Sequence, residues 1–127
     1  MKAKQDKNLP SSSDVDKYER ISPLLEALYL EITALSKKNP NDALNTLKIK
    51  MINRVLNEVK SFLETDPNVG FLELLDEATL PSNSDTVVII GQFIAILSQF
   101  KARYHRFDGI RRVHRWSTAE DPIRQTT

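Results

Sequence analysis

The residues whose side chains are best suited to binding or catalysis lie together near the C-terminus, in the stretch KARYHRFDGIRRVHRW at 101–116. This stretch holds six Lys or Arg residues, both histidines of the chain and its only tryptophan. Arginines can neutralise phosphates and aromatic rings can stack on bases, but arginines also pair with acidic protein surfaces. We therefore identify a candidate binding patch made of Arg111, Arg112, His114, Arg115 and Trp116.

The charge of the chain is unevenly distributed, although its formal sum is only +1. Residues 61–100 contain six acidic residues and no Lys or Arg, whereas residues 101–127 contain seven basic and three acidic residues. Such segregation indicates a charged partner, or contact between the two segments within the fold or across a dimer. The small net charge argues against a dedicated nucleic-acid-binding domain. We predict a non-catalytic helical protein–protein interaction module that forms a homodimer, and the alternative is a nucleic-acid-binding protein that uses the basic stretch.

Motifs for catalysis or cofactor binding are missing from the sequence. The chain has no cysteine, and its three glycines stand too far apart to form a phosphate-binding loop. It contains no G-x-S-x-G motif, and its two histidines do not have the H-E-x-x-H spacing of zinc enzymes. Glu73, Asp76 and Glu77 would share a helix face, which we interpret as a solvated face or a partner for the arginines. The sequence therefore predicts no enzyme activity, no metal and no cofactor.

Two consecutive segments carry apolar residues at helical spacing. The first helix is predicted to begin at Ser22 and Pro23 and to end at Asn39. The second is predicted to begin at Asn39 or Asn41 and to end near Asp66. Because the link is short, we expect an antiparallel helical hairpin. The predicted apolar face of the second helix comprises Leu44, Leu47, Met51, Ile52, Val55, Val59 and Phe62.

The segment TVVIIGQFIAIL at 86–97 could form a buried strand or a buried helix. We predict a helix, because the apolar pattern continues to Phe100 and Tyr104 and no second strand candidate could pair with it. The apolar run is too short for a bilayer, which needs about twenty residues, so we expect no membrane partner. Either the chain encloses this helix, or one face packs on a second copy. The candidate dimer face is Val87, Ile90, Ile94 and Leu97.

The basic stretch is predicted to divide at Gly109. There the third helix would end with glycine in the left-handed conformation, and its last cations would be favoured by the helix dipole. A further turn of helix would then fold Ile110, Val113 and Trp116 onto the bundle. These patterns predict an all-α protein: a small helical bundle built from an antiparallel helical hairpin, a third, largely buried apolar helix and a short docked C-terminal segment.

The domain organisation follows from length and composition. A chain of 127 residues suits one domain with its own core, which we place at residues 13–116. Residues 1–12 are predicted to be a flexible N-terminal arm and residues 117–127 a flexible C-terminal tail. The N-terminus lacks the apolar core of a secretory signal, so we expect a cytoplasmic protein.

Overall fold

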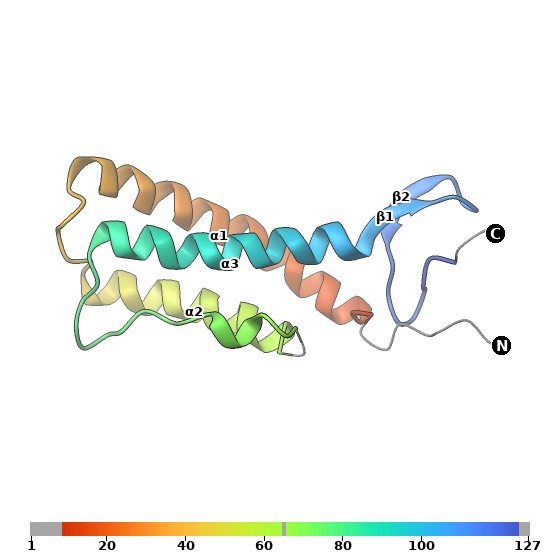
Figure 1. Cartoon of the computed structure of the whole chain (residues 1–127), viewed down its shortest axis with the longest axis horizontal. Coiled ribbons are helices and arrows are strands. Elements are labelled where there is room, and N and C mark those ends of the chain that lie inside the picture. The colour runs from red at the N-terminus through yellow and green to blue at the C-terminus, as the bar shows by residue number, and fades with distance from the viewer. Residues whose placement is uncertain (1–8, 65, 125–127) are drawn as a thin grey trace.

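The computed structural model describes residues 9–64 and 66–124, which are mostly helical (Figure 1). The elements are α1 (Ser12–Lys38), α2 (Thr46–Phe62), the 3-10 turn η1 (Val69–Phe71), α3 (Asn83–Tyr104), β1 (His105–Asp108) and β2 (Val113–Trp116). α1 and α2 run antiparallel, and α3 runs beside them in the direction of α2 (Figure 1). The predicted helical architecture is confirmed, but the all-α class is wrong because the chain continues from α3 into an antiparallel two-stranded sheet.

α1 begins at Ser12, well before the predicted start at Ser22 and Pro23. Ser11 and Asp14 form a reciprocal capping box: the Ser11 hydroxyl accepts from the Asp14 N–H at 3.0 Å, and the Asp14 carboxylate accepts from the Ser11 N–H at 3.1 Å. Pro23 lies inside the helix, where it removes one backbone hydrogen bond without ending the helix. Of the predicted N-terminal arm, residues 9 and 10 precede the cap, Ser11 is the cap and Ser12 begins α1, whereas residues 1–8 lie outside the described residues.

In contrast to α1, α2 begins later than predicted, at Thr46, and Asn45 caps it by accepting from the Lys48 N–H at 2.8 Å. The link at 39–45 is not helical, because its backbone bonds to the segment that precedes α3. The Leu44 N–H donates to the Pro81 carbonyl at 2.8 Å, for example. This pairing fixes the start of α3 against the turn between α1 and α2.

The buried face of α2 is rotated from the predicted one. Leu47 and Met51, which we placed on the apolar face, are exposed, whereas Ile49 and Leu56 are fully buried. Asn53 is also buried on this face, and its amide pairs with both backbone groups of Leu75, at 2.9 Å to the carbonyl and 2.8 Å from the N–H. The polar Asn53 therefore belongs to the interior, because it attaches the segment after η1 to the helix.

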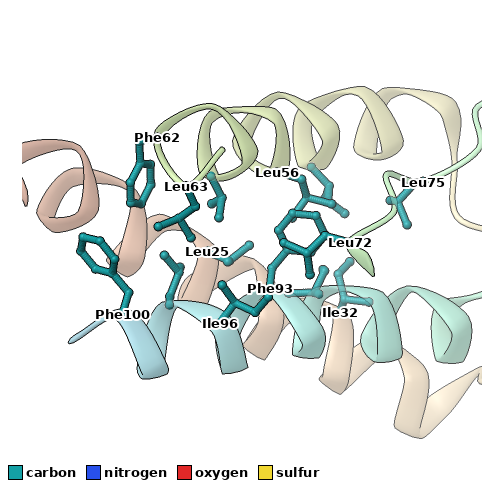
Figure 2. Close-up of a cluster of buried hydrophobic side chains, with 14 of the residues drawn as sticks. Leu25, Ile32, Leu56, Phe62, Leu63, Leu72, Leu75, Phe93, Ile96 and Phe100 are labelled. Carbon is teal, nitrogen blue, oxygen red and sulfur yellow. The ribbon is translucent and has the colours of Figure 1, made fainter. Parts of the chain in front are cut away.

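The core lies among the three helices and that attached segment (Figure 2). Phe93 of α3 has no exposed surface and lies among core side chains of α1, α2 and the attached segment. Burial of such side chains contributes about 1.5–3 kcal/mol each before the entropy of ordering is subtracted. The residues labelled in Figure 2 are Leu25, Ile32, Leu56, Phe62, Leu63, Leu72, Leu75, Phe93, Ile96 and Phe100.

α3 is the most apolar helix of the described chain. By length and composition alone it could cross a membrane, with a mean hydropathy of 1.3 over its most apolar stretch. Core helices of globular proteins meet the same criterion. Here α3 buries Ile90, Phe93 and Phe100 against the other helices and turns Val88 outward. The prediction that this segment is a helix rather than a strand is confirmed.

Candidate interaction surface at the C-terminal hairpin

The basic stretch forms the last turn of α3 and a β-hairpin that projects beyond it (Figure 1). His105 pairs with Trp116 and Phe107 with His114, so these four side chains share one face of the hairpin. The Arg112 N–H donates to the Asp108 carbonyl at 2.7 Å to close the turn.

The left-handed residue of this turn is Arg112, with φ of 61°, and not Gly109 as predicted. In this four-residue turn the left-handed residue is the last one, at the return to β2, whereas Gly109 is the first residue of the turn and its φ is not positive. The predicted helix end at Gly109 is therefore wrong: α3 ends at Tyr104, and Gly109 belongs to a hairpin turn.

Asp108 organises this turn from a buried position. Its Oδ1 accepts from the Ile110 and Arg111 N–H groups at 2.9 and 3.1 Å, and its Oδ2 accepts from Arg115 Nε at 2.8 Å. The Arg111 N–H, followed by the Arg115 side chain, holds the pKa of the Asp108 carboxyl below its usual value. Asp108 is therefore an ionised carboxylate that closes the turn and pairs with an arginine of the candidate patch.

Arg115 is committed to this internal network. Its Nη1 donates to the carbonyls of Trp116 and Asp121 at 3.1 and 2.8 Å, and its Nη2 donates to the Pro122 carbonyl at 3.2 Å. The side chain is only 16% exposed. A guanidinium with these partners holds the last residues against the hairpin and has little capacity left for a ligand.

Arg111 has a second aspartate as its partner. Its Nη1 and Nη2 donate to the two Asp121 carboxylate oxygens at 3.0 and 2.9 Å, a bidentate pair. The Arg111 side chain lowers the pKa of Asp121, and Asp121 in turn raises the pKa of Arg111. Arg111 and Arg115 therefore form, with Asp108 and Asp121, what we call the arginine–aspartate clasp.

Trp116 packs at the base of the hairpin. Its ring centroid lies 5.1 Å from that of Tyr18, 5.7 Å from Phe100 and 5.2 Å from His105. Its indole Nε1 is 3.4 Å from a Glu19 oxygen, a long hydrogen bond. Trp116 thus joins the hairpin to α1 and α3, which leaves it poorly placed to stack on a nucleic-acid base.

The outer part of the hairpin carries solvent-exposed side chains. Of the residues predicted to fold onto the bundle, Ile110 and Val113 are instead exposed, because the hairpin extends past the helices. Phe107 is 53% exposed, and its ring contacts His114 at a centroid distance of 5.2 Å. We define the hairpin surface as Arg106, Phe107, Ile110, Arg112, Val113 and His114.

The hairpin surface contains cations that the fold does not use. Within residues 9–64 and 66–124, Arg106 and Arg112 make no salt bridge, in contrast to Arg111 and Arg115. The candidate patch is therefore divided: Arg112 and His114 face outward, and the other three members serve the fold.

The residues after β2 are part of the folded domain, contrary to the flexible tail predicted from 117 onward. Ser117 and Thr118 are buried, and the Ala119 N–H donates to the Pro10 carbonyl at 2.9 Å. The Glu120 carboxylate accepts from the Ser12 N–H at 2.9 Å, which lowers its pKa. These contacts tie residues 117–124 to the start of α1, and residues 125–127 of the predicted tail lie outside the described residues.

The candidate dimer face of α3 lies largely within the chain. Ile90 and Leu97 are buried, whereas Val87 and Ile94 are half-buried and pack against the core. α1 covers this side, since a methyl group at Gly91 would lie 3.7 Å from Tyr29 Cε1. These four residues therefore do not form an open seam, and homodimerisation stays a prediction that another surface must support.

Other predicted features also change place. Glu73, Asp76 and Glu77 do not share a helix face, because residues 72–76 are not helical and Glu77 lies in a turn. Among the described residues, no group of three or more His, Cys, Asp or Glu residues could hold a metal ion. Sequence reasoning missed Asp108 and Asp121 as structural partners, although the Asp-Gly pair between two β-prone runs is a hairpin signal.

The described chain is thus a mostly helical protein with a charged C-terminal hairpin. No protein-family model matches it, and no curated protein or solved structure matches it either.

Proposed function

We propose that this protein is a non-catalytic interaction module that binds a protein partner through its hairpin surface. The observation that carries the proposal is the exposure of Phe107, Ile110 and Val113 at the end of a hairpin whose backbone is fixed by the clasp. Exposed apolar side chains beside charged ones are typical of protein-binding sites. A fixed hairpin also loses little entropy when it binds.

The remaining cations define the kind of partner. Arg106 lies on the face of the hairpin opposite to Phe107, and Arg112 lies in the turn next to Val113. A partner that encloses the end of the hairpin would meet apolar side chains and cations together, so its surface should combine an apolar centre with an acidic rim. The nucleic-acid alternative is less well supported, because Arg111 and Arg115 are paired with aspartates and Trp116 is packed against the bundle.

The test compares two purified variants as bait for proteins from the source cells. Phe107→Ser with Ile110→Ser removes apolar area from the hairpin surface. The control, Leu24→Ser with Leu30→Ser, removes equally exposed leucines from α1. We expect the wild type and the control to capture a protein that the hairpin variant does not capture. Binding of that protein is then reproduced with purified components.

Two results would overturn the proposal. One is that every captured protein binds the hairpin variant as well as the control. The other is that wild type binds a single-stranded oligonucleotide at low salt and loses this binding when Arg106 and Arg112 are neutralised, which would support the nucleic-acid alternative.

A further inference from the structure

An open groove lies beside the start of α3, at the opposite end of that helix from the hairpin. Its volume is about 620 Å³. Apolar side chains of Leu74, Leu80, Val88 and Ile89 form part of its wall. Three carboxylates, from Glu73, Asp76 and Asp85, lie along it. We call it the acidic groove.

The carboxylates of the acidic groove form no ion pair among the described residues; the nearest cation given by a contact is Lys60, whose Nζ donates to the Leu72 carbonyl at 2.8 Å. The sequence has no Lys or Arg between positions 61 and 100. Within residues 9–64 and 66–124, none of Glu73, Asp76 and Asp85 forms a salt bridge. The groove therefore combines an apolar wall with carboxylates that have no salt-bridge partner, the two properties that the hairpin surface requires of a partner.

One chain cannot bring its own hairpin to its own groove. α3 has 22 residues and spans about 33 Å, with the hairpin at its C-terminal end and the groove at its N-terminal end. Figure 1 shows the hairpin projecting away from the helices, and the segment that leads into α3 lies at the other end. The two surfaces can therefore meet only between molecules.

We propose that the acidic groove binds the hairpin surface of a second copy of this chain, so that copies associate head to tail. Phe107 and Ile110 would contact the apolar wall near Val88, while Arg106 and Arg112 would pair with the carboxylates. This inference rests on the proposed function and names the partner. Because the two surfaces differ, the assembly closes as a two-fold dimer where each copy places its hairpin in the groove of the other, and otherwise continues into a ring or a filament.

The experiment blocks each surface separately without creating a new attraction. The hairpin-neutral variant carries Arg106→Gln and Arg112→Asn; asparagine tolerates the positive φ at position 112. The groove-neutral variant carries Asp76→Asn and Asp85→Asn, which keep the size of the side chains. Sedimentation velocity then gives the mass of each purified protein over a range of concentrations.

Wild-type protein should grow in mass with concentration at low salt and less so at high salt. Each neutral variant should associate about tenfold more weakly or worse, since close interfacial charge pairs contribute at least that much. Mixed in equal amounts, the two variants should form a heterodimer and nothing larger. The groove-neutral variant supplies the one intact hairpin, and the hairpin-neutral variant supplies the one intact groove. The matched controls are Lys50→Gln with Arg54→Gln and Glu26→Gln with Glu58→Gln, on exposed helix positions; they should associate as wild type does.

A wild-type protein that stays monomeric at all concentrations would overturn the inference. So would association that the neutral variants retain, or a mixture that yields no heterodimer. These failures are separate from failure of the proposed function, which is tested by capture of other proteins. A monomer that still binds a purified partner through Phe107 and Ile110 would reject the second copy as the partner and keep the interaction module.

Discussion

At its N-terminal end α3 is tied to the rest of the chain by neutral hydrogen bonds, whereas at its C-terminal end it continues into a hairpin held by charged groups. The Asn83 amide donates to the Asn39 carbonyl at 2.9 Å, and the Asn83 N–H donates to the Asp42 carbonyl at the same distance. At the other end, Asp108 and Asp121 bind two arginines. The two ends of one helix are thus anchored by different chemistry.

This difference determines how the stability of each end of α3 depends on pH and salt. Neutral amide and backbone groups keep their hydrogen bonds over a wide range of pH and salt, and their loss is costly only when a buried partner is left unpaired. Carboxylate–guanidinium pairs depend on ionisation and are screened by salt where they are exposed. We therefore expect the hairpin, and with it the hairpin surface, to respond to solution conditions that leave the helical core unchanged.

The largest effect should come from a neutral anchor in the core. Asn53→Leu conserves approximate size but leaves the buried N–H and carbonyl of Leu75 without partners. Each unpaired buried group costs about 1–3 kcal/mol, so the free energy of unfolding should fall by about 3 kcal/mol in urea denaturation. The same change at the exposed Asn57 of α2 should stay within about 0.5 kcal/mol. Equal effects at the two positions would show that the Asn53 amide does not anchor the segment.

Asn53 also shows where sequence reasoning reaches its limit. The apolar pattern is enough to predict three helices, and α2 and α3 lie close to their predicted positions. The same pattern cannot show that a buried asparagine serves an extended segment distant in sequence, because its partners are backbone groups. It also placed Leu47 and Met51 inside although they are exposed.

The candidate site shows the same limit in another form. Arginines at 111, 112 and 115 look equivalent in the sequence, and only the fold shows that Asp121 and Asp108 bind two of them. One signal was available: Asp108 and Gly109 stand between alternating residues, which indicates a hairpin turn more strongly than a helix end. The basic composition favours a ligand-binding patch, whereas the Asp-Gly signal favours a hairpin over a helix end.

Lowering the pH should weaken the arginine–aspartate clasp before it affects the neutral anchor at Asn53. The pKa of Asp108 and that of Asp121 are lowered in the folded protein, so their contribution is complete above the ordinary value of about 3.9. It falls as the pH drops below that value and is lost as the pH passes through the folded pKa. NMR should show the amides of Ile110 and Arg111, which donate to Asp108, change in this window before the amide of Leu75 does.

The control for the acid experiment is Asp108→Asn, in which the Ile110 and Arg111 amides should show no transition in that window. If the Leu75 amide changes together with them in wild-type protein, the hairpin unfolds only with the core. That outcome would remove the distinction between the charged clasp of the hairpin and the neutral hydrogen bonds of the core.

The smallest effect should come from the more exposed arginine of the clasp. Arg111→Gln removes a pair whose two side chains are about half exposed, and Arg115 still binds Asp121. Arg115→Gln instead leaves the buried Asp108 carboxylate without its side-chain donor and releases the carbonyls of residues 121 and 122. Hydrogen exchange of residues 105–116 should therefore accelerate about tenfold or more in Arg115→Gln and change little in Arg111→Gln. The reverse order would mean that the exposed bidentate pair, and not the buried carboxylate, holds the hairpin.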